Sequence, residues 1–238
     1  MKEIFLEEVD STNLYGKSNL DSLDDRTVIH ALSQTSGRGR FTRAWKNLGA
    51  GNLFLSFVLK PSNDFRSVYS NLTQYLSVVL CNILERYGIT PQIKWPNDVL
   101  VNNKKIAGIL SETVMQGQLF RGLVLGIGVN LNATFDLLGE IDKPATALNL
   151  EIGRNVDVFE FKNYLVSEFF AEYNKFLETG FEYIKSKYIS RADFLDKEIC
   201  VQIFDKKSKG IARSITDNGE LVLDSKGKNV VLTIGDIL

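Results

Sequence analysis

An arginine-rich loop that directly follows a largely apolar run is the feature that most constrains the fold of this chain. The run Thr27–Leu32 is typical of a buried strand. The segment Gln34–Trp45 then brings two glycines and three arginines. Glycine lets a loop approach a ligand closely, and arginine offers a planar fork of donors that matches carboxylate and phosphate oxygens. The loop is therefore either a solvated basic turn or an anion clamp, and the other motifs must decide.

The composition is that of an ordinary globular protein and disfavours several functional classes. Of the 238 residues, 44% are hydrophobic and 24% are charged, which suits one large domain or one domain with a small appendage. The net charge of −1 gives no global basic field of the kind that drives non-specific nucleic-acid binding. No secretory signal and no apolar run of membrane-spanning length occurs, so we expect no membrane partner.

The cysteines and the histidine point to structure rather than to chemistry. Cys81 and Cys200 each lie in an apolar pattern without a CxxC partner, which predicts two buried, reduced thiols and a cytoplasmic location. The single histidine, His30, lies inside the apolar run, so we expect it in the core. A histidine-rich metal site and a Ser-His-Asp triad are therefore disfavoured.

Strand and helix patterns alternate along the first part of the chain. We expect strands at Ile4–Val9, Asn52–Leu59, both sides of a hairpin turn at Asn102-Asn103 with the return strand starting at Lys105, and Leu119–Leu125 ahead of a loop at 126–132. We expect helices after the start signal Asp10–Asn13, over Phe65–Tyr87, Thr146–Leu150 and 181–190, and from the Asp157–Glu160 capping box to Gly180. Segment 132–145 is predicted to be a mobile loop.

The sequence pattern changes near Asp196. From there, short β-like runs alternate with turns rich in lysine and glycine. Several short strands in so few residues favour a small barrel of the SH3 type. We therefore predict an α+β fold: a mixed or antiparallel sheet with flanking helices over residues 1–195, and an SH3-like β-barrel over residues 196–238.

The polar residues at the breaks between these elements are rich in hydrogen-bond donors and poor in nucleophiles. They are the cations Arg38, Arg40, Arg43, Lys94 and Lys105, the amides Gln34, Asn97 and Asn130, and the carboxylate Asp98. Such a set suits phosphoryl or nucleotidyl transfer to a carboxylate, because that catalysis is mostly positioning and charge neutralisation. Asp98 would help to hold Mg²⁺ against the phosphates. Neither a GxGxxG motif nor a Walker P-loop identifies the nucleotide.

Five motifs, in order, resemble those of the biotin–protein ligases, the holocarboxylase synthetase family. They are Asp10-Ser11-Thr12-Asn13, then Gln34 with Gly37-Arg38-Gly39-Arg40, Lys94-Trp95-Pro96-Asn97-Asp98, Lys105 to Leu110, and Gly126 to Asn130. The resemblance covers essentially the whole chain, and it implies a catalytic domain like that of class II aminoacyl-tRNA synthetases. It also implies a two-step reaction, in which biotin and ATP form biotinyl-5′-AMP and the adenylate then acylates a lysine of a biotin carboxyl carrier protein.

The resemblance also implies roles for individual residues. Ser11, Thr12, Asn13 and Gln34 match the positions that bind biotin, together with Arg38, Gly39 and Arg40 of the loop, Lys105, Gly108, Gly126 and Gly128. The positions near the nucleotide are matched by Arg38, Arg40, Arg43, Trp45, Asn97 and Asn130. Asp98 matches the position that binds the metal. Lys105 and Arg40 are the implied catalytic residues.

Only nine residues precede Asp10, so we expect the monofunctional form, without a DNA-binding domain and without DNA as a partner. A homodimer is compatible with the family. A lipoate- or octanoate-protein ligase is the nearest alternative, but the chain lacks the Gly-Gly-Gly lipoate signature. A non-catalytic RNA- or anion-binding module is the alternative from another class, and the net charge of −1 argues against it.

Overall fold

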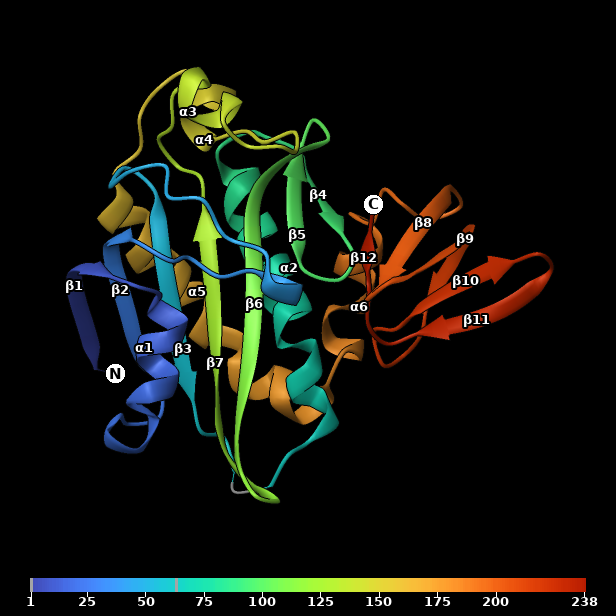
Figure 1. The fold of residues 1–238 in the computed structure, drawn as a ribbon, viewed down its shortest axis with the longest axis horizontal. Helices are drawn as coiled ribbons and strands as arrows, with labels where there is room; N and C mark the ends of the chain where they lie inside the picture. The colour runs from blue at the N-terminus through green and yellow to red at the C-terminus, as the bar shows by residue number, and fades with distance from the viewer. Residues whose placement is uncertain (1, 63) are drawn as a thin grey trace. The chain divides into compact units, whose positions relative to one another are not determined.

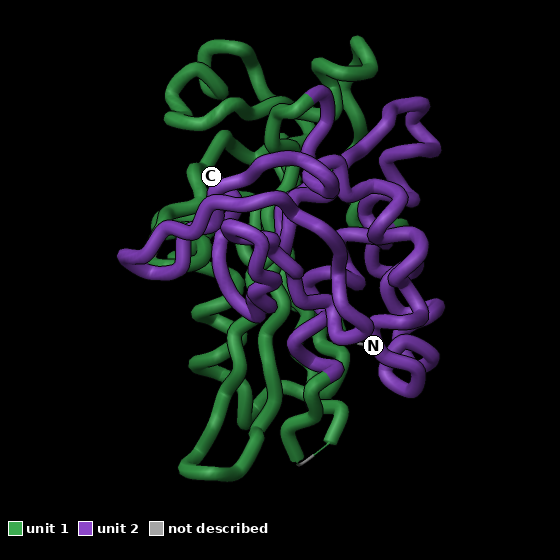
Figure 2. The backbone as a smooth tube through the Cα atoms, turned by 90° about the vertical axis from the view of Figure 1, so that its right-hand side faces the viewer, with its two compact units in different colours: residues 1–67, 103–164 green, residues 68–102, 165–238 purple. Residues whose placement is uncertain are grey.

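The structure is a computed structural model, and it describes residues 2–62 and 64–238 of the chain (Figure 1). The chain divides into two compact units, each built from two separate segments (Figure 2). Unit 1 comprises residues 1–67 and 103–164, and unit 2 comprises residues 68–102 and 165–238. These units do not follow the predicted division at residue 195, which stays a prediction about domains.

Unit 1 is built on a mixed sheet, as predicted. Its strands are β1 (Glu3–Val9), β2 (Thr27–Gln34), β3 (Leu53–Leu59), β6 (Lys104–Gln116) and β7 (Leu119–Val129), in the order β1-β2-β3-β7-β6. β1 and β2 are parallel, and the remaining pairs are antiparallel. Every residue of β3 is buried, so this apolar strand forms the centre of the unit's core.

Short helices connect the strands of unit 1. They are α1 (Thr12–Ser18), η1 (Leu20–Ser22), η2 (Arg40–Thr42), α3 (Phe135–Gly139) and α4 (Leu148–Ile152), and α5 (Val158–Thr179) begins here and continues into unit 2. The predicted helix start at Asp10–Asn13 is confirmed, and the structure identifies Ser11 as the cap of α1, because its Oγ accepts a hydrogen bond of 3.5 Å from the backbone N–H of Leu14. A Cβ added at Gly16 would lie 3.1 Å from side-chain atoms of both Ile29 and Val124, so glycine lets α1 lie directly on the sheet.

Unit 2 combines two long helical segments with a second sheet. It contains α2 (Leu72–Arg86), the part of α5 from Leu165 onwards, the hairpin β4 (Pro91–Lys94) and β5 (Asp98–Val101), and α6 (Glu182–Ile189). The 3₁₀ helix η3 (Ser67–Asn71) also belongs to this unit, apart from its first residue. The C-terminal strands β8 (Glu198–Ile203), β9 (Lys206–Ile215), β10 (Leu221–Ser225), β11 (Lys228–Leu232) and β12 (Asp236–Ile237) pair in the order β11-β10-β9-β8-β12. The predicted run of short C-terminal strands is therefore confirmed, and the structure shows that they pair antiparallel.

The turn between β9 and β10 ties the C-terminal sheet to the rest of unit 2. The backbone oxygen of Gly219 accepts hydrogen bonds from Gln74 Nε2 at 2.8 Å and from the indole Nε1 of Trp95 at 3.1 Å. Asn71 Nδ2 donates to the backbone oxygen of Asn218 at 2.8 Å. The tryptophan of the Lys94–Asp98 motif thus has a structural role that the sequence did not reveal.

Several sequence predictions need correction. The strand predicted to end at Leu125 continues to Val129, because Gly126 to Val129 pair with both neighbouring strands. Segment 132–145 is not wholly a loop, since it contains α3. The first turn of the helix predicted over Phe65–Tyr87 is the 3₁₀ helix η3. Cys81 is buried and Cys200 is only half-buried.

No helix among the described residues is both long enough and apolar enough to cross a membrane.

His30 lies in the core, as predicted, and burial perturbs its titration. Its side chain is fully buried, and its ring lies 5.6 Å from that of Phe5 and 5.4 Å from that of Phe159. The pKa of His30 is lowered from its ordinary 6.5 to about 4, chiefly by burial; the charge of Lys162 also lowers this pKa, and that of Glu3 raises it. The folded protein therefore keeps this imidazole neutral at mildly acidic pH.

We predict that His30 makes the protein less stable as the pH falls below about 6.5. The unfolded chain protonates this side chain between about pH 6.5 and pH 4, whereas the folded chain does not, so stability is complete above this window and is lost as the pH falls through it. Between pH 7.5 and pH 5 the loss should be about 2 kcal/mol. Urea unfolding of the wild type and of His30→Leu at both pH values checks this. The pH-dependent loss should shrink by that amount in the variant, and an unchanged loss would contradict the assignment.

Candidate active site

On one face of the unit 1 sheet, β6 and β7 carry glycines instead of residues with side chains. Side chains from other segments lie directly on the backbone there. Gly108 and Gly128 are direct partners across the strand pair. A Cβ added at Gly128 would lie 2.4 Å from Trp45 Cε2, and one added at Gly108 would lie 2.8 Å from Trp45 Cζ3. A Cβ added at Gly126 would lie 2.1 Å from Asn13 Oδ1. Side chains of the protein itself therefore lie directly on the backbone at these glycines. The predicted approach of biotin to Gly126 and Gly128 stays a prediction.

The residues that begin α1 form a buried polar row with the end of β2 and the middle of β3. The row consists of Ser11, Thr12, Asn13, Gln34 and Ser56, all buried. Gln34 Oε1 accepts from the backbone N–H of Thr12 at 2.8 Å and from its hydroxyl at 3.1 Å. The hydroxyl of Ser56 lies 2.8 Å from Thr12 Oγ1 and 2.7 Å from Asn13 Oδ1. The folded chain thus brings together a row of directional polar groups that the sequence keeps far apart.

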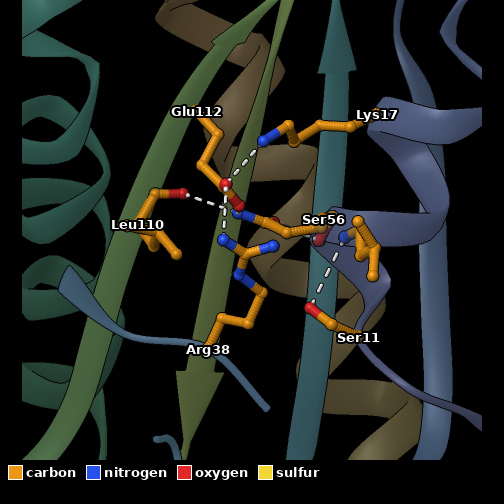
Figure 3. Close-up of polar contacts among 8 residues, drawn as sticks. Ser11, Lys17, Arg38, Ser56, Leu110 and Glu112 are labelled. Atoms are coloured by element: carbon orange, nitrogen blue, oxygen red, sulfur yellow. Dashed lines mark hydrogen bonds and ion pairs between the residues drawn. The ribbon is translucent and has the colours of Figure 1, made fainter. Parts of the chain in front are cut away.

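A carboxylate on β6 ends this row. Glu112 accepts from Asn13 Nδ2 at 3.0 Å and from Lys17 Nζ at 2.8 Å, and its Oε1 lies 3.6 Å from a guanidinium nitrogen of Arg38 (Figure 3). Burial raises the pKa of Glu112, but the hydrogen bonds from Lys17 and Asn13 and the charges of Lys17 and Arg38 outweigh it, so the net shift is downward. The carboxylate is therefore ionised at neutral pH.

The arginine-rich loop folds back on itself through backbone hydrogen bonds. The N–H of Gly39 donates to the oxygen of Arg43 at 2.7 Å, and the N–H of Trp45 donates to the oxygen of Gly37 at 2.9 Å. Arg40 starts the short helix η2, and its guanidinium carbon lies 5.0 Å from the ring centroid of Phe41. Arg38 and Arg43 are exposed at either side of this turn.

Trp45 brings the end of the loop to the predicted catalytic lysine. The Nζ of Lys105, at the start of β6, lies 5.3 Å from the centroid of the Trp45 ring. This distance suits a cation–π contact, which holds the ammonium beside the glycine-lined face. Lys105, Trp45, Gly108 and Gly128 are thus neighbours, as the sequence prediction requires of a single site.

The segment that precedes α4 is fixed beside Lys105 and Asn130. The backbone N–H of Lys105 donates to Pro144 O at 2.9 Å, and that of Thr146 donates to Lys105 O at 2.9 Å. Asn130 is buried, and its Nδ2 donates to Thr146 O at 2.9 Å. A cavity of about 390 Å³ lies against this segment, lined by residues that include Phe135, Ile141 and Thr146. Asn130 therefore positions this loop through its side-chain nitrogen.

Asn97 and Asp98 belong to unit 2, where they connect β4 to β5. Asn97 is buried, Asp98 is half-buried and starts β5, and Lys94 is the register partner of Asp98. Among the described residues, no group of three His, Cys, Asp or Glu side chains could hold a metal ion. One carboxylate suits an Mg²⁺ that arrives with phosphate oxygens, because Mg²⁺ keeps waters and commonly binds through one or two carboxylates plus substrate.

The sequence prediction missed three residues: Ser56 in the buried polar row, Glu112 at the end of that row, and Lys17, which bonds to Glu112. Ser56 gave a weak signal, because a serine in the middle of an otherwise apolar strand is a polar group that must find a buried partner. Glu112 follows the Lys105–Leu110 motif directly, but nothing local distinguishes it from a solvated glutamate. Its partners come from α1 and the loop, so only the fold reveals it.

Comparison with known proteins places the chain in a family. The model of the biotin/lipoate A/B protein ligase family matches residues 5–130, which is more than half of the chain. The chain belongs to this family. The matched range contains the buried polar row, the arginine loop, Lys105 and the glycines of β6 and β7.

Individual relatives agree with this assignment. The chain is 33% identical to a biotin–[acetyl-CoA-carboxylase] ligase of Paracoccus denitrificans, over 98% of each chain. It is 31% identical to the bifunctional ligase/repressor BirA of Bacillus subtilis, over 84% of this chain but only 62% of that relative's length. The biotin protein ligase of Aquifex aeolicus, solved in complex with biotin and ATP, superposes with a TM-score of 0.82 at 28% identity, covering 100% of this chain and 97% of the other.

We predict that Gly128→Ala displaces Trp45 from the sheet. The new methyl group would overlap the indole, and overpacking of this kind typically costs about 1–3 kcal/mol. Acrylamide should quench the fluorescence more strongly in this variant, because Trp95 is buried and Trp45 is the half-buried tryptophan. Gly139→Ala is the matched control, since nothing lies within 4 Å of its added Cβ. Equal quenching in both variants would show that Trp45 does not rest on Gly128.

Proposed function

We propose that this protein is a biotin–protein ligase, which forms biotinyl-5′-AMP from biotin and ATP and transfers biotin to a lysine of a biotin carboxyl carrier domain. The observation that carries the proposal is the glycine-lined face with a buried polar row at one end and Lys105 at the other. Gly126 and Gly128 lie two residues apart along β7, roughly 7 Å by the rise of a strand. A small acid could therefore span from the row to the lysine.

The two ends of this face suit the two ends of biotin. Biotin's cyclic urea carries N–H donors and a carbonyl acceptor, and the row of Ser11, Thr12, Asn13 and Gln34 offers hydroxyl, amide and backbone groups of both kinds. Its carboxylate would meet the ammonium of Lys105. Arg38, Gly39 and Arg40 would close over the acid, while Arg43, Trp45, Asn97 and Asn130 would serve the nucleotide. Gly108, Gly126 and Gly128 let the ligand approach the backbone.

The first step joins two anions, so the chain must chiefly neutralise and position them. A carboxylate oxygen of biotin attacks the α-phosphorus of ATP, a new P–O bond forms, and the bond to pyrophosphate breaks. Lys105 and Arg40 would stabilise the charge that develops on the α-phosphate oxygens. In the second step the uncharged amine of the acceptor lysine attacks the acyl carbon, AMP leaves with the C–O bond electrons, and the nitrogen loses a proton.

Asp98 is the residue that would hold Mg²⁺ when ATP is bound. The metal would supply charge neutralisation of the phosphates. The other finer assignments are also proposals: a cytoplasmic location, a catalytic domain at 1–195 with the small barrel at 196–238, and compatibility with a homodimer.

The identity of the acid is tested by pyrophosphate exchange into ATP. The family model covers biotin and lipoate ligases alike, so the family alone does not choose between them. We expect exchange with biotin and little or none with lipoate or octanoate. Exchange with lipoate alone would identify a lipoate ligase, and no exchange with any of the three acids would favour a binding module.

Lys105→Ala tests the catalytic assignment. Removing the ammonium should reduce adenylation by about 100-fold or more, because charge stabilisation at a transition state is commonly worth that much. Biotin affinity, measured by calorimetry, should change by no more than about threefold if this charge matters mainly in the transition state. The matched control is Lys197→Ala, which removes an exposed lysine that pairs with Asp193 at 2.7 Å. Full turnover in Lys105→Ala would assign the role to another residue.

A further inference from the structure

Glu112 is surrounded by donors and cations, and it lies outside every sequence motif. Its side chain is only 13% exposed, on β6 two residues beyond Leu110 (Figure 3). Oε2 accepts from Asn13 Nδ2, and Oε1 accepts from Lys17 Nζ with Arg38 beyond it. An ionised carboxylate can only accept hydrogen bonds. Each neighbour that bonds to Glu112 must therefore act as the donor.

This polarity fixes the side-chain amide of Asn13. Its Nδ2 donates to the backbone oxygen of Leu110 at 3.2 Å and to the carboxylate of Glu112 at 3.0 Å. Both partners are obligate acceptors, so a flipped amide would set oxygen against oxygen twice. Asn13 Oδ1 must therefore point to the other side, where it lies 2.7 Å from Ser56 Oγ and above Gly126.

The orientation of Asn13 decides what the buried row offers to a ligand. With Oδ1 towards Gly126, the row presents an acceptor on the glycine-lined face. With the amide reversed it would present an NH₂ group there. A head group with N–H donors, such as a cyclic urea, needs the first arrangement, because a buried donor left without an acceptor weakens binding.

The same carboxylate also anchors the arginine loop. The guanidinium nitrogen of Arg38 lies 3.6 Å from Oε1, a distance typical of an ion pair without a direct hydrogen bond. Arg38 pairs with Ala44 across the turn of the loop, so this contact connects the loop to β6. Glu112 thus faces the acid-binding row with one oxygen and the loop with the other.

We propose that Glu112 is a positioning residue that selects for an acid whose head group carries N–H donors, by fixing the acceptor end of Asn13 on the glycine-lined face and holding Arg38 beside it. The inference rests on the proposed function, since it names how that site distinguishes biotin from a plain fatty acid. Glu112 itself need not touch the ligand. It acts through Asn13.

Glu112→Gln tests this with almost no change of size. The glutamine has one accepting oxygen for the three donors and adds an NH₂ group, to which a reversed Asn13 would offer its oxygen. The KM for biotin should rise by about 10-fold or more, while kcat and the KM for ATP change by less than about threefold. Glu140→Gln, which breaks an exposed ion pair with Lys46 at 2.9 Å, is the surface control.

A double-mutant cycle separates this role from general destabilisation. Calorimetric biotin affinity is measured for Asn13→Ala, Glu112→Gln and the double variant, with thermal melts to show that each is folded. If Glu112 acts through Asn13, its substitution should add less than about twofold once Asn13 is alanine. Equal losses in both backgrounds, or an unchanged KM in Glu112→Gln, would overturn the inference. Should Glu112→Gln fail to fold, Asn13→Ala must still lose biotin affinity about 10-fold or more, and normal affinity would overturn it.

The wild-type protein keeps the two proposals distinguishable. If the wild type exchanges pyrophosphate with biotin but the KM for biotin is unchanged in Glu112→Gln, only the positioning role is overturned. Absence of biotin binding in the wild type would instead overturn the proposed function, and the inference that rests on it.

Discussion

The absence of side chains at Gly126 and Gly128 is the constraint on which the rest of unit 1 depends. Asn13 and Trp45 lie where Cβ atoms at these positions would stand, so α1 and the arginine loop both approach the backbone of β7. Neighbouring strands complete the surface: Gly108 faces Gly128 across β6, and Ser56 faces Gly126 across β3. One end of this face is therefore polar and buried, and the other carries an aromatic ring with a lysine beside it.

This arrangement explains how a chain with few nucleophilic groups can support a transfer reaction. In the proposed reaction the acid supplies the attacking oxygen and the nucleotide supplies the leaving group, so the protein needs directional hydrogen bonds at one end and cations at the other. The buried row holds its groups in fixed orientations through Gln34, Ser56 and Glu112. The loop contributes arginines on a backbone that is already paired with itself.

Much of the fold was predictable, because strands and caps leave local signals. The apolar run of β2, the helix start at Asp10–Asn13 and the stop at Gly180 follow from periodicity and backbone preference. The end of β7 was predicted wrongly, because Gly126 and Gly128 resemble a loop signal. In the structure they lie within the strand, and their missing side chains leave room for Asn13 and Trp45. Glu112 and Ser56 could not be predicted as site members, because their partners come from segments distant in sequence. The tie between Trp95 and Gly219 was hidden for the same reason.

The most direct test of the account is a crystal structure of the protein with biotin bound. The account predicts that the cyclic urea lies on the glycine-lined face above Gly126, within hydrogen-bonding distance of Thr12, Asn13 or Gln34. It also predicts that the carboxylate points towards Lys105 and that residues 37–45 contact the ligand. Biotin bound elsewhere, or bound on this face with the loop remote from it, would contradict the account.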